Sequence, residues 1–206
     1  MNIIKINDVD RKILNIAYPI ILANITIPLL GITDTAVLGQ LGDLNILAGI
    51  SLGAVIIGAI YWFFGFLRMG MTGLVSQARG EGDSNEVVSL LIRGLCIAFG
   101  GGVLLIFVQS FLFDATFYIL SAEESPEKLS RNYMSVRMIS APFAISCFVI
   151  TGWLFGLGRT HEALYLLLII NISNIFLDIL FVKAFYLGIN GVAFATVFSE
   201  ILGFLF

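Results

Sequence analysis

Long apolar runs separated by short polar segments are the main pattern of this chain. The runs reach about 20 residues, which is the length an α-helix needs to cross a hydrocarbon core about 30 Å thick. They are too long, and alternate too little, to be strands of a transmembrane barrel. We therefore predict an all-α integral membrane protein with six transmembrane helices. The spans are expected at about residues 13–38, 46–67, 87–113, 133–157, 163–185 and from 190 onward.

The polar segments predict how these helices are connected. Residues 1–12 read as a polar cytoplasmic N-terminal segment, and residues 13–206 as one six-helix unit. The glycines and charges of residues 69–83, MGMTGLVSQARGEGD, indicate a helix end and a loop. Asp114 to Arg131 is predicted to be the longest polar connection. The sixth run stops at Phe206 before a span would end, so we expect the last helix, and the chain as given, to be incomplete.

Prolines and glycines inside the spans predict bends and close helix contacts. Pro19 and Pro28 both fall in the first span. Pro28 has no N–H to donate to the Asn24 carbonyl and is expected to bend the helix there. Gly49 and Gly53 are spaced for close contact with another helix. The run of glycines at 100–102 is expected to be a contact or bending site, because no strand precedes it and no lysine follows it as in a phosphate-binding loop.

Composition agrees with the membrane prediction and limits the classes of partner that the chain is expected to bind. Hydrophobic residues make up 59% of the chain and charged residues 12%, whereas soluble domains have about 25% charged residues. The mean hydropathy is +1.01, and the net charge of −3 with a pI near 5.0 argues against a nucleic-acid partner. Membrane lipid is the partner that this composition implies.

The distribution of basic residues predicts the orientation. With a cytoplasmic N-terminus, seven lysines and arginines flank inner helix ends and four flank outer ends, in keeping with the positive-inside tendency. The four placed on the outer side are Lys128, Arg131, Arg137 and Lys183.

Candidate chemistry begins in the fifth span, which places Asn174 and Asp178 one helical turn apart in an apolar run. A carboxylate is costly in lipid, so Asp178 should face a protein interior or a water-filled cavity and is a functional candidate. The alternative is that it only bonds a neighbouring helix.

The predicted topology brings further polar residues to the same depth. Asp34 and Asp178 each lie within about two turns of the outer surface, and Thr196 lies about six residues into the inward-running sixth span. We expect Asp34, Asn174, Asp178 and Thr196 to meet there. Their oxygens suit Na⁺, and repulsion between two carboxylates favours a proton on one of them. Thr196 has the alternative of bonding to its own helix, and Glu200 either lines the same cavity or joins helices.

Other reactive side chains indicate no further chemistry. His161 lies in a short loop beside Arg159 and Glu162 and is read as solvent-facing rather than as a metal ligand or catalytic residue. Cys96 and Cys147 lie inside apolar runs and are read as small packing residues rather than as a disulfide or metal site. No cofactor is predicted, and no metal beyond a possible Na⁺ at Asp34, Asn174 and Asp178.

Four segments carry a resemblance to a known family. They are NITIPLLGITDTAVLGQLG, FLRMGMTGLVSQARGEGD, GWLFGLGRT and NISNIFLDILFVKAFYLGINGVAFATVFSE. Together they resemble the multidrug and toxic compound extrusion (MATE) transporters, and within them the DNA-damage-inducible (DinF-type) subfamily. The resemblance runs in register from about Tyr18 to Phe206.

The resemblance implies one half of a twelve-helix, two-lobe antiporter that exports drugs or other small amphipathic compounds against inward flow of H⁺ or Na⁺. This chain corresponds to the N-terminal lobe, with the C-terminal lobe absent. The family's cation-site residues fall on Asp34, Asn174, Asp178 and Thr196, and its helix-bending proline falls on Pro19. In DinF-type members the aspartate matching Asp34 is regarded as the protonation site, which favours H⁺ as coupling ion. A bacterial inner membrane is the implied location.

Three rival functions remain as alternatives. An intramembrane aspartyl protease also needs two aspartates, but Asp34 follows Thr33 and Asp178 follows Leu177, without the tyrosine or Gly-x-Gly context of that family. A lipid-intermediate flippase has a similar arrangement of helices but would require a more cationic cavity, able to hold a pyrophosphate group. A scaffold protein without transport activity is the third.

Overall fold

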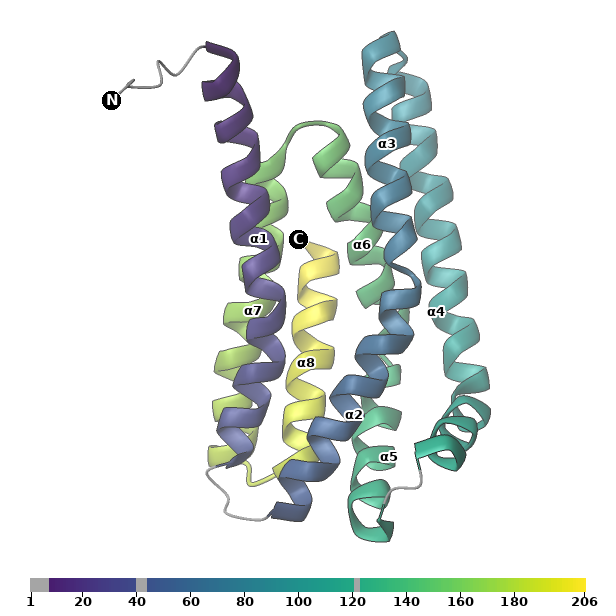
Figure 1. The fold of residues 1–206 in the computed structure, drawn as a ribbon, viewed down its shortest axis with the longest axis vertical. Helices are drawn as coiled ribbons and strands as arrows, with labels where there is room; N and C mark the ends of the chain where they lie inside the picture. Colours follow the sequence, from purple (N-terminus) through teal and green to yellow (C-terminus); the bar gives the residue numbers. More distant parts are fainter. Residues whose placement is uncertain (1–7, 40–43, 121–122) are drawn as a thin grey trace, which may run out of the picture.

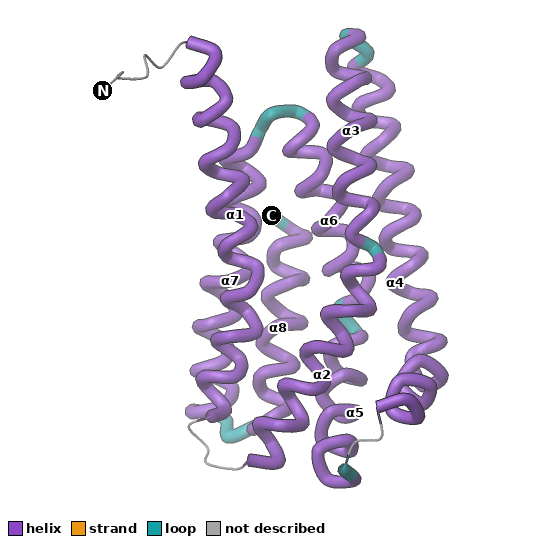
Figure 2. The backbone as a smooth tube through the Cα atoms, in the orientation of Figure 1, coloured by secondary structure: helices purple, strands orange, loops and turns teal. Residues whose placement is uncertain are grey.

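The computed structural model describes residues 8–39, 44–120 and 123–206, without the side chains of 8–10, 12, 26–30 and 38. The described residues form α-helices and one short π-helix, and no strand occurs among them (Figures 1 and 2). The elements are α1 (Asp8–Gly39), α2 (Leu44–Phe63), α3 (Gly65–Glu81), α4 (Ser84–Leu120), α5 (Glu124–Met138), α6 (Ala141–Gly156), α7 (Thr160–Ile179), η1 (Leu180–Ala184) and α8 (Gly188–Leu205). The all-α prediction is confirmed.

The six predicted apolar runs correspond to α1, α2–α3, α4, α5–α6, α7–η1 and α8. Within the described part of the chain, four of these are continuous helices long and apolar enough to cross a membrane, and the bent pair α5–α6 makes a fifth. The described apolar stretch of α1 is Ile13–Ile25. The architecture is therefore that of a multi-pass membrane protein.

Two predicted connections are wrong, because helices occupy most of their residues. α3 continues through Glu81 and ends only at Gly82, whose φ of 76° suits glycine. The buried residues Leu67, Met71, Val75 and Ala78 follow a helical spacing along α3, and α3 packs against α6 and α4. This tertiary contact outweighs the low helix propensity of the glycines.

The long connection predicted over 114–131 is also helical at both ends. α4 continues through Leu120, with Phe113 and Phe117 buried one turn apart, and α5 begins at Glu124. Two acidic residues in the first turn of α5, Glu124 and Glu127, suit the positive end of the helix dipole.

The predicted fourth span is broken rather than continuous. α5 and α6 meet at 59°, with Ile139 and Ser140 between them and Pro142 in the first turn of α6. Proline has no N–H to give and its ring clashes with the carbonyl four residues back, which here belongs to Met138 at the end of α5. The break places Arg137 inside the protein, where it is 9% exposed, so its predicted position at an outer helix end is wrong.

Close approach of helices at glycine is confirmed at two predicted places. A Cβ added to Gly49 would lie 2.7 Å from Cβ of Leu129, and one on Gly53 would lie 2.9 Å from Cδ1 of Tyr133. These contacts hold α2 against α5. In the glycine run of α4, Gly102 lies directly against the backbone of Pro142 at the α5–α6 break, whereas Gly100 faces open space.

The two glycines of α4 provide a matched test of this contact. We expect Gly102→Ala to lower the thermal unfolding temperature of the purified protein, because overpacking against a rigid backbone costs about 1–3 kcal/mol. Gly100→Ala should be neutral or slightly stabilising, since alanine favours helix by roughly 0.5–1 kcal/mol. Equal unfolding temperatures for the two variants would contradict the contact.

The helices pack in three groups. α1 packs along α7, α2 along α5, and α3 and α4 along α6. Figure 1 shows α8, in yellow, between these groups, and α8 contacts α5, α6 and α7. This arrangement sets the acidic and basic residues of α1, α5, α7 and α8 around a common interior.

Candidate cation site beside a central cavity

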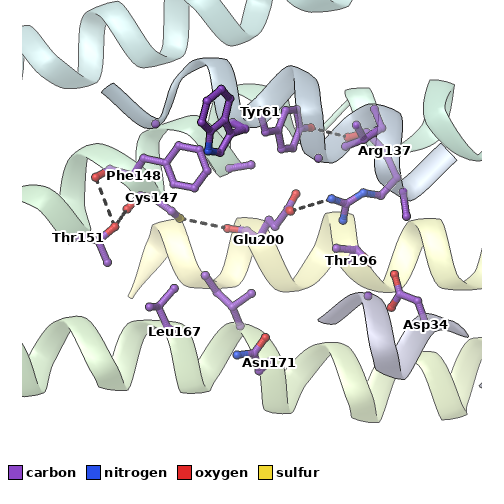
Figure 3. A pocket seen from close by; sticks show the side chains of 18 of the residues that line it. Asp34, Tyr61, Arg137, Cys147, Phe148, Thr151, Leu167, Asn171, Thr196 and Glu200 are labelled. Atoms are coloured by element: carbon purple, nitrogen blue, oxygen red, sulfur yellow. Dashed lines mark hydrogen bonds and ion pairs between the residues drawn. The ribbon is translucent and has the colours of Figure 1, made fainter. Parts of the chain in front are cut away.

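A cavity of about 440 Å³ lies in the middle of the bundle (Figure 3). Its lining comes from α1, α2, α3, α5, α6, α7 and α8. Most of the lining side chains are apolar or aromatic, among them Ile57, Trp62, Phe148 and Leu167. Such a surface accommodates amphipathic molecules through hydrophobic contact, with a few polar groups to orient them.

Two aspartates lie at this site, between α1 and α7. Asp34 lines the cavity and is 3% exposed, and Asp178 is fully buried. The two carboxyl groups are neighbours. Tyr133 Oη donates a hydrogen bond of 3.3 Å to Asp34 Oδ2. The structure therefore brings together the two acidic residues that the sequence singled out.

Asn174 and Thr196 adjoin this acidic pair. Asn174 is close to Asp34, and its Nδ2 donates to Thr196 Oγ1 over 3.1 Å. Thr196 Oγ1 in turn donates to the Val192 carbonyl of its own helix. The threonine thus makes the local bond expected of it and also fixes the Asn174 amide.

The unsatisfied atoms of the site share one property. Among the described residues, Asp34 Oδ1, both carboxylate oxygens of Asp178 and Asn174 Oδ1 are buried without a hydrogen-bond partner. All four are acceptors, and buried acceptors without a donor are costly. A proton or a small cation is the ligand that would satisfy them, so the residues present fit H⁺ or Na⁺.

The two prolines of α1 lie on the helix that carries Asp34. Pro19 is buried, and α1 is a continuous helix from Asp8 to Gly39. The side chain of Pro28 falls outside the described residues.

A buried ion pair was missed by the sequence reasoning. Arg137 Nη2 lies 3.2 Å from Glu200 Oε1, and both side chains line the cavity. Ser140 Oγ bonds the other Glu200 oxygen, and Tyr61 Oη donates to the Arg137 backbone carbonyl. Glu200 therefore both lines the cavity and joins helices. An arginine inside the predicted span 133–157 was the available signal, because a buried cation requires a partner.

Of the remaining candidates, His161 and Cys96 lie outside the cavity lining, whereas Cys147 lines the cavity and its Sγ contacts the Glu200 backbone carbonyl. His161 is exposed at the start of α7. Cys96 is exposed and Cys147 is buried, and both are free thiols. In the described part of the chain, no cluster of three or more His, Cys, Asp or Glu residues could hold a metal ion.

The fold and the site define a helical membrane lobe with an acidic pair beside a largely apolar cavity. Residues 19–180 match the family model described as MatE. The chain belongs to the MatE (multidrug and toxic compound extrusion) family.

Its relatives support the finer resemblance as well. The chain is 34% identical over 191 residues to DNA damage-inducible protein F of Escherichia coli (strain K12), covering 93% of this chain and 42% of that protein. It is 24% identical over 203 residues to the multidrug export protein MepA of Staphylococcus saprophyticus, covering 97% of this chain and 44% of that protein. The DinF-type resemblance is confirmed.

Solved structures confirm the fold class. A crystal structure of MATE in the bent conformation superimposes with a TM-score of 0.87 at 22% identity, covering 97% of this chain and 44% of that one. The chain spans less than half the length of the relatives it matches, and its six-helix fold corresponds to one lobe of them.

Proposed function

We propose that this chain is the N-terminal lobe of a cation-coupled antiporter that exports drugs or other small amphipathic compounds. The proposed location is the bacterial inner membrane with the N-terminus in the cytoplasm, and a second six-helix lobe completes the substrate path. One of the named relatives, MepA, is a multidrug export protein, which supports transport over the protease alternative.

The observation that carries this proposal is the buried aspartate pair with unsatisfied oxygens at the wall of an apolar cavity. A proton or Na⁺ bound there removes buried negative charge. Asp34 belongs to α1, Asp178 to α7 and Thr196 to α8. Loss of charge between these helices changes which helix arrangement is favoured, and substrate couples to the cation by preferring a different arrangement.

H⁺ is our first choice of coupling ion and Na⁺ the second. One proton held between two neighbouring carboxyl groups turns two repelling acceptors into a donor and an acceptor. The carboxyl groups of Asp34 and Asp178 are neighbours, which is the arrangement that a shared proton requires. Na⁺ would be coordinated by the same carboxylate oxygens and by Asn174 Oδ1. That amide oxygen also lacks a hydrogen-bond partner.

The charged side chains inside the bundle help to separate the antiporter proposal from the flippase alternative. Three acidic residues, Asp34, Asp178 and Glu200, are buried in the described part of the chain, against one buried arginine, Arg137. The cavity itself is lined by two acidic side chains, Asp34 and Glu200, and two arginines, Arg68 and Arg137. A pyrophosphate head group would meet acidic as well as basic groups there, which supports export of amphipathic compounds over transfer of a lipid diphosphate.

Ion substitution in proteoliposomes tests the proposal. The complete protein is reconstituted with a fluorescent amphipathic cation, and an inward gradient of H⁺ or of Na⁺ is imposed separately. We expect substrate movement to follow the H⁺ gradient and to be unchanged when Na⁺ is replaced by K⁺. Movement that follows only Na⁺ would assign the second ion, and movement independent of both gradients would contradict cation coupling.

A further inference from the structure

Two of the apolar runs are interrupted near their middle, and the two interruptions adjoin each other. Phe64 separates α2 from α3, and Ile139 and Ser140 separate α5 from α6. Tyr61, in the last turn of α2, donates a hydrogen bond of 3.1 Å from its Oη to the backbone carbonyl of Arg137, in the last turn of α5 (Figure 3). This hydrogen bond joins the two breaks directly.

The backbone at both breaks is wound more tightly than an α-helix. The Phe64 N–H donates to the Tyr61 carbonyl over 2.9 Å, and the Ser140 N–H donates to the Arg137 carbonyl over 3.2 Å. Both bonds connect residues three apart, as in a 3₁₀-helix, and a 3₁₀ turn within a helical run often marks a hinge. A Cβ added to Gly65, beside the first break, would meet no neighbouring atom within 4 Å, which leaves room for the chain to rotate there.

The helices on the two sides of the breaks form two closely packed pairs. Figure 1 shows α2 and α5 in the lower half of the lobe and α3 and α6 in the upper half. The α2–α5 pair is held by the contacts at Gly49 and Gly53. In the α3–α6 pair, Gly152 lies directly against the backbone of Arg68, and Thr72 Oγ1 donates to the Gly152 carbonyl over 3.2 Å. Close packing along each pair makes it a rigid unit.

Polar contacts between α5 and the helices outside its pair are of a kind that exchanges easily. Arg131 is paired with Asp114 of α4 at 2.7 Å, with side-chain exposures of 33% and 71%, and Asn132 Nδ2 donates to Asn190 Oδ1 of α8 over 2.9 Å. Exposed contacts of this kind contribute little to stability. The buried ion pair of Arg137 lies at the break itself, where a rotation displaces atoms least.

We propose that α2 and α5 move together as one rigid pair, relative to α3 and α6, about the adjoining breaks at Phe64 and Ser140. Two discrete arrangements of packed units are the usual form of such a movement. The pair carries Tyr133, whose Oη bonds Asp34, so its rotation changes a contact of the candidate cation site. That consequence rests on the proposed function, whereas the hinge itself does not.

Distances between spin labels on the complete protein in lipid nanodiscs test the hinge, after its native cysteines are replaced by alanine. Labels at Lys128 on α5 and Gln77 on α3 measure the distance across the breaks. The matched controls are labels at Val55 and Lys128, within the α2–α5 pair, and at Gln77 and Ile97, on α3 and α4, which pack together. All four positions are exposed. A rotation of about 15° over the roughly 16 Å of helix from the break to Lys128 moves that label by about 4 Å.

Two substitutions at the breaks should shift the balance between the two arrangements. Tyr61→Phe removes only the hydroxyl that bonds the Arg137 carbonyl, and Ser140→Ala removes a second donor to the same carbonyl. Each should change the ratio of the two distances across the breaks about fivefold, which is the size expected for the loss of one hydrogen bond. Tyr165→Phe, at an exposed tyrosine of α7, is the matched control and should leave the ratio unchanged.

The outcomes decide the hinge separately from the proposed function. A change across the breaks that leaves both control distances fixed supports the hinge, whether or not export follows a cation gradient. Distances across the breaks that stay the same in both variants overturn it, even if gradient-driven export is observed. Equal changes in the control distances also overturn it, because the packed units would then not be rigid. If one variant does not fold, the other gives the decision alone.

Discussion

Replacing Asp34 by asparagine is expected to abolish gradient-driven export while the protein still folds and binds substrate. Asparagine keeps the size of the side chain and can still accept from Tyr133, which bonds Asp34 Oδ2 in the native protein. It cannot exchange a proton, and the charge that drives the helix rearrangement is lost. Coupling free energies of about 1–3 kcal/mol correspond to losses of roughly 5- to 150-fold in the coupled step.

Two assays on the same proteoliposomes identify this loss as one of coupling. Net export driven by an H⁺ gradient should fall, whereas exchange of labelled for unlabelled substrate without a gradient should continue. Asp114→Asn is the matched control, because Asp114 is exposed on α4 and paired with Arg131. Undiminished export by the Asp34 variant would remove Asp34 from the coupling role.

The second large effect is expected at the ion pair of Arg137 and Glu200. Removing one member leaves the other charge buried without a partner, which costs about 3–5 kcal/mol. Arg137→Gln and Glu200→Gln should each lower the unfolding free energy by about that amount, and the double variant should recover most of the loss. The measurement is a double-mutant cycle by reversible denaturation in mixed micelles.

A more exposed pair between α5 and α4 supplies the reference for this cycle. Arg131 and Asp114 have side-chain exposures of 33% and 71%, and pairs of this kind contribute about 1 kcal/mol or less. Losses at Arg137 and Glu200 that simply add would show that the two charges act independently and would contradict the buried pair.

Much of the fold was predictable because its causes are local. The length and apolar character of each run decide whether a helix crosses a membrane, and that information lies within about 20 consecutive residues. The spacing of Gly49 and Gly53 likewise predicted a close helix contact, and the structure confirms it. The errors fell where local signals were weaker than tertiary contact, as in α3, whose glycines suggested a loop but whose apolar face packs against α6.

The sequence predicted at what depth in the bundle the candidate-site residues lie. It did not predict which face each helix turns toward its neighbours. Span lengths place Asp34, Asp178 and Thr196 at one level, since each residue of helix advances about 1.5 Å along the axis. Which face of each helix turns toward which neighbour depends on contacts between residues far apart in the chain. The neighbouring positions of Asp34 and Asp178 are therefore a result of α1 packing along α7.

The sequence by itself determined the membrane class, the six apolar spans, the acidic candidates and, through the motifs of the first, fifth and sixth spans, the family. Only the tertiary structure decided that α5 and α6 meet at an angle, and that Arg137 consequently turns inward to pair with Glu200 across 63 residues of chain. The physical reason is that hydrophobicity is a property of each segment. The partner of a buried charge is a property of the assembled bundle.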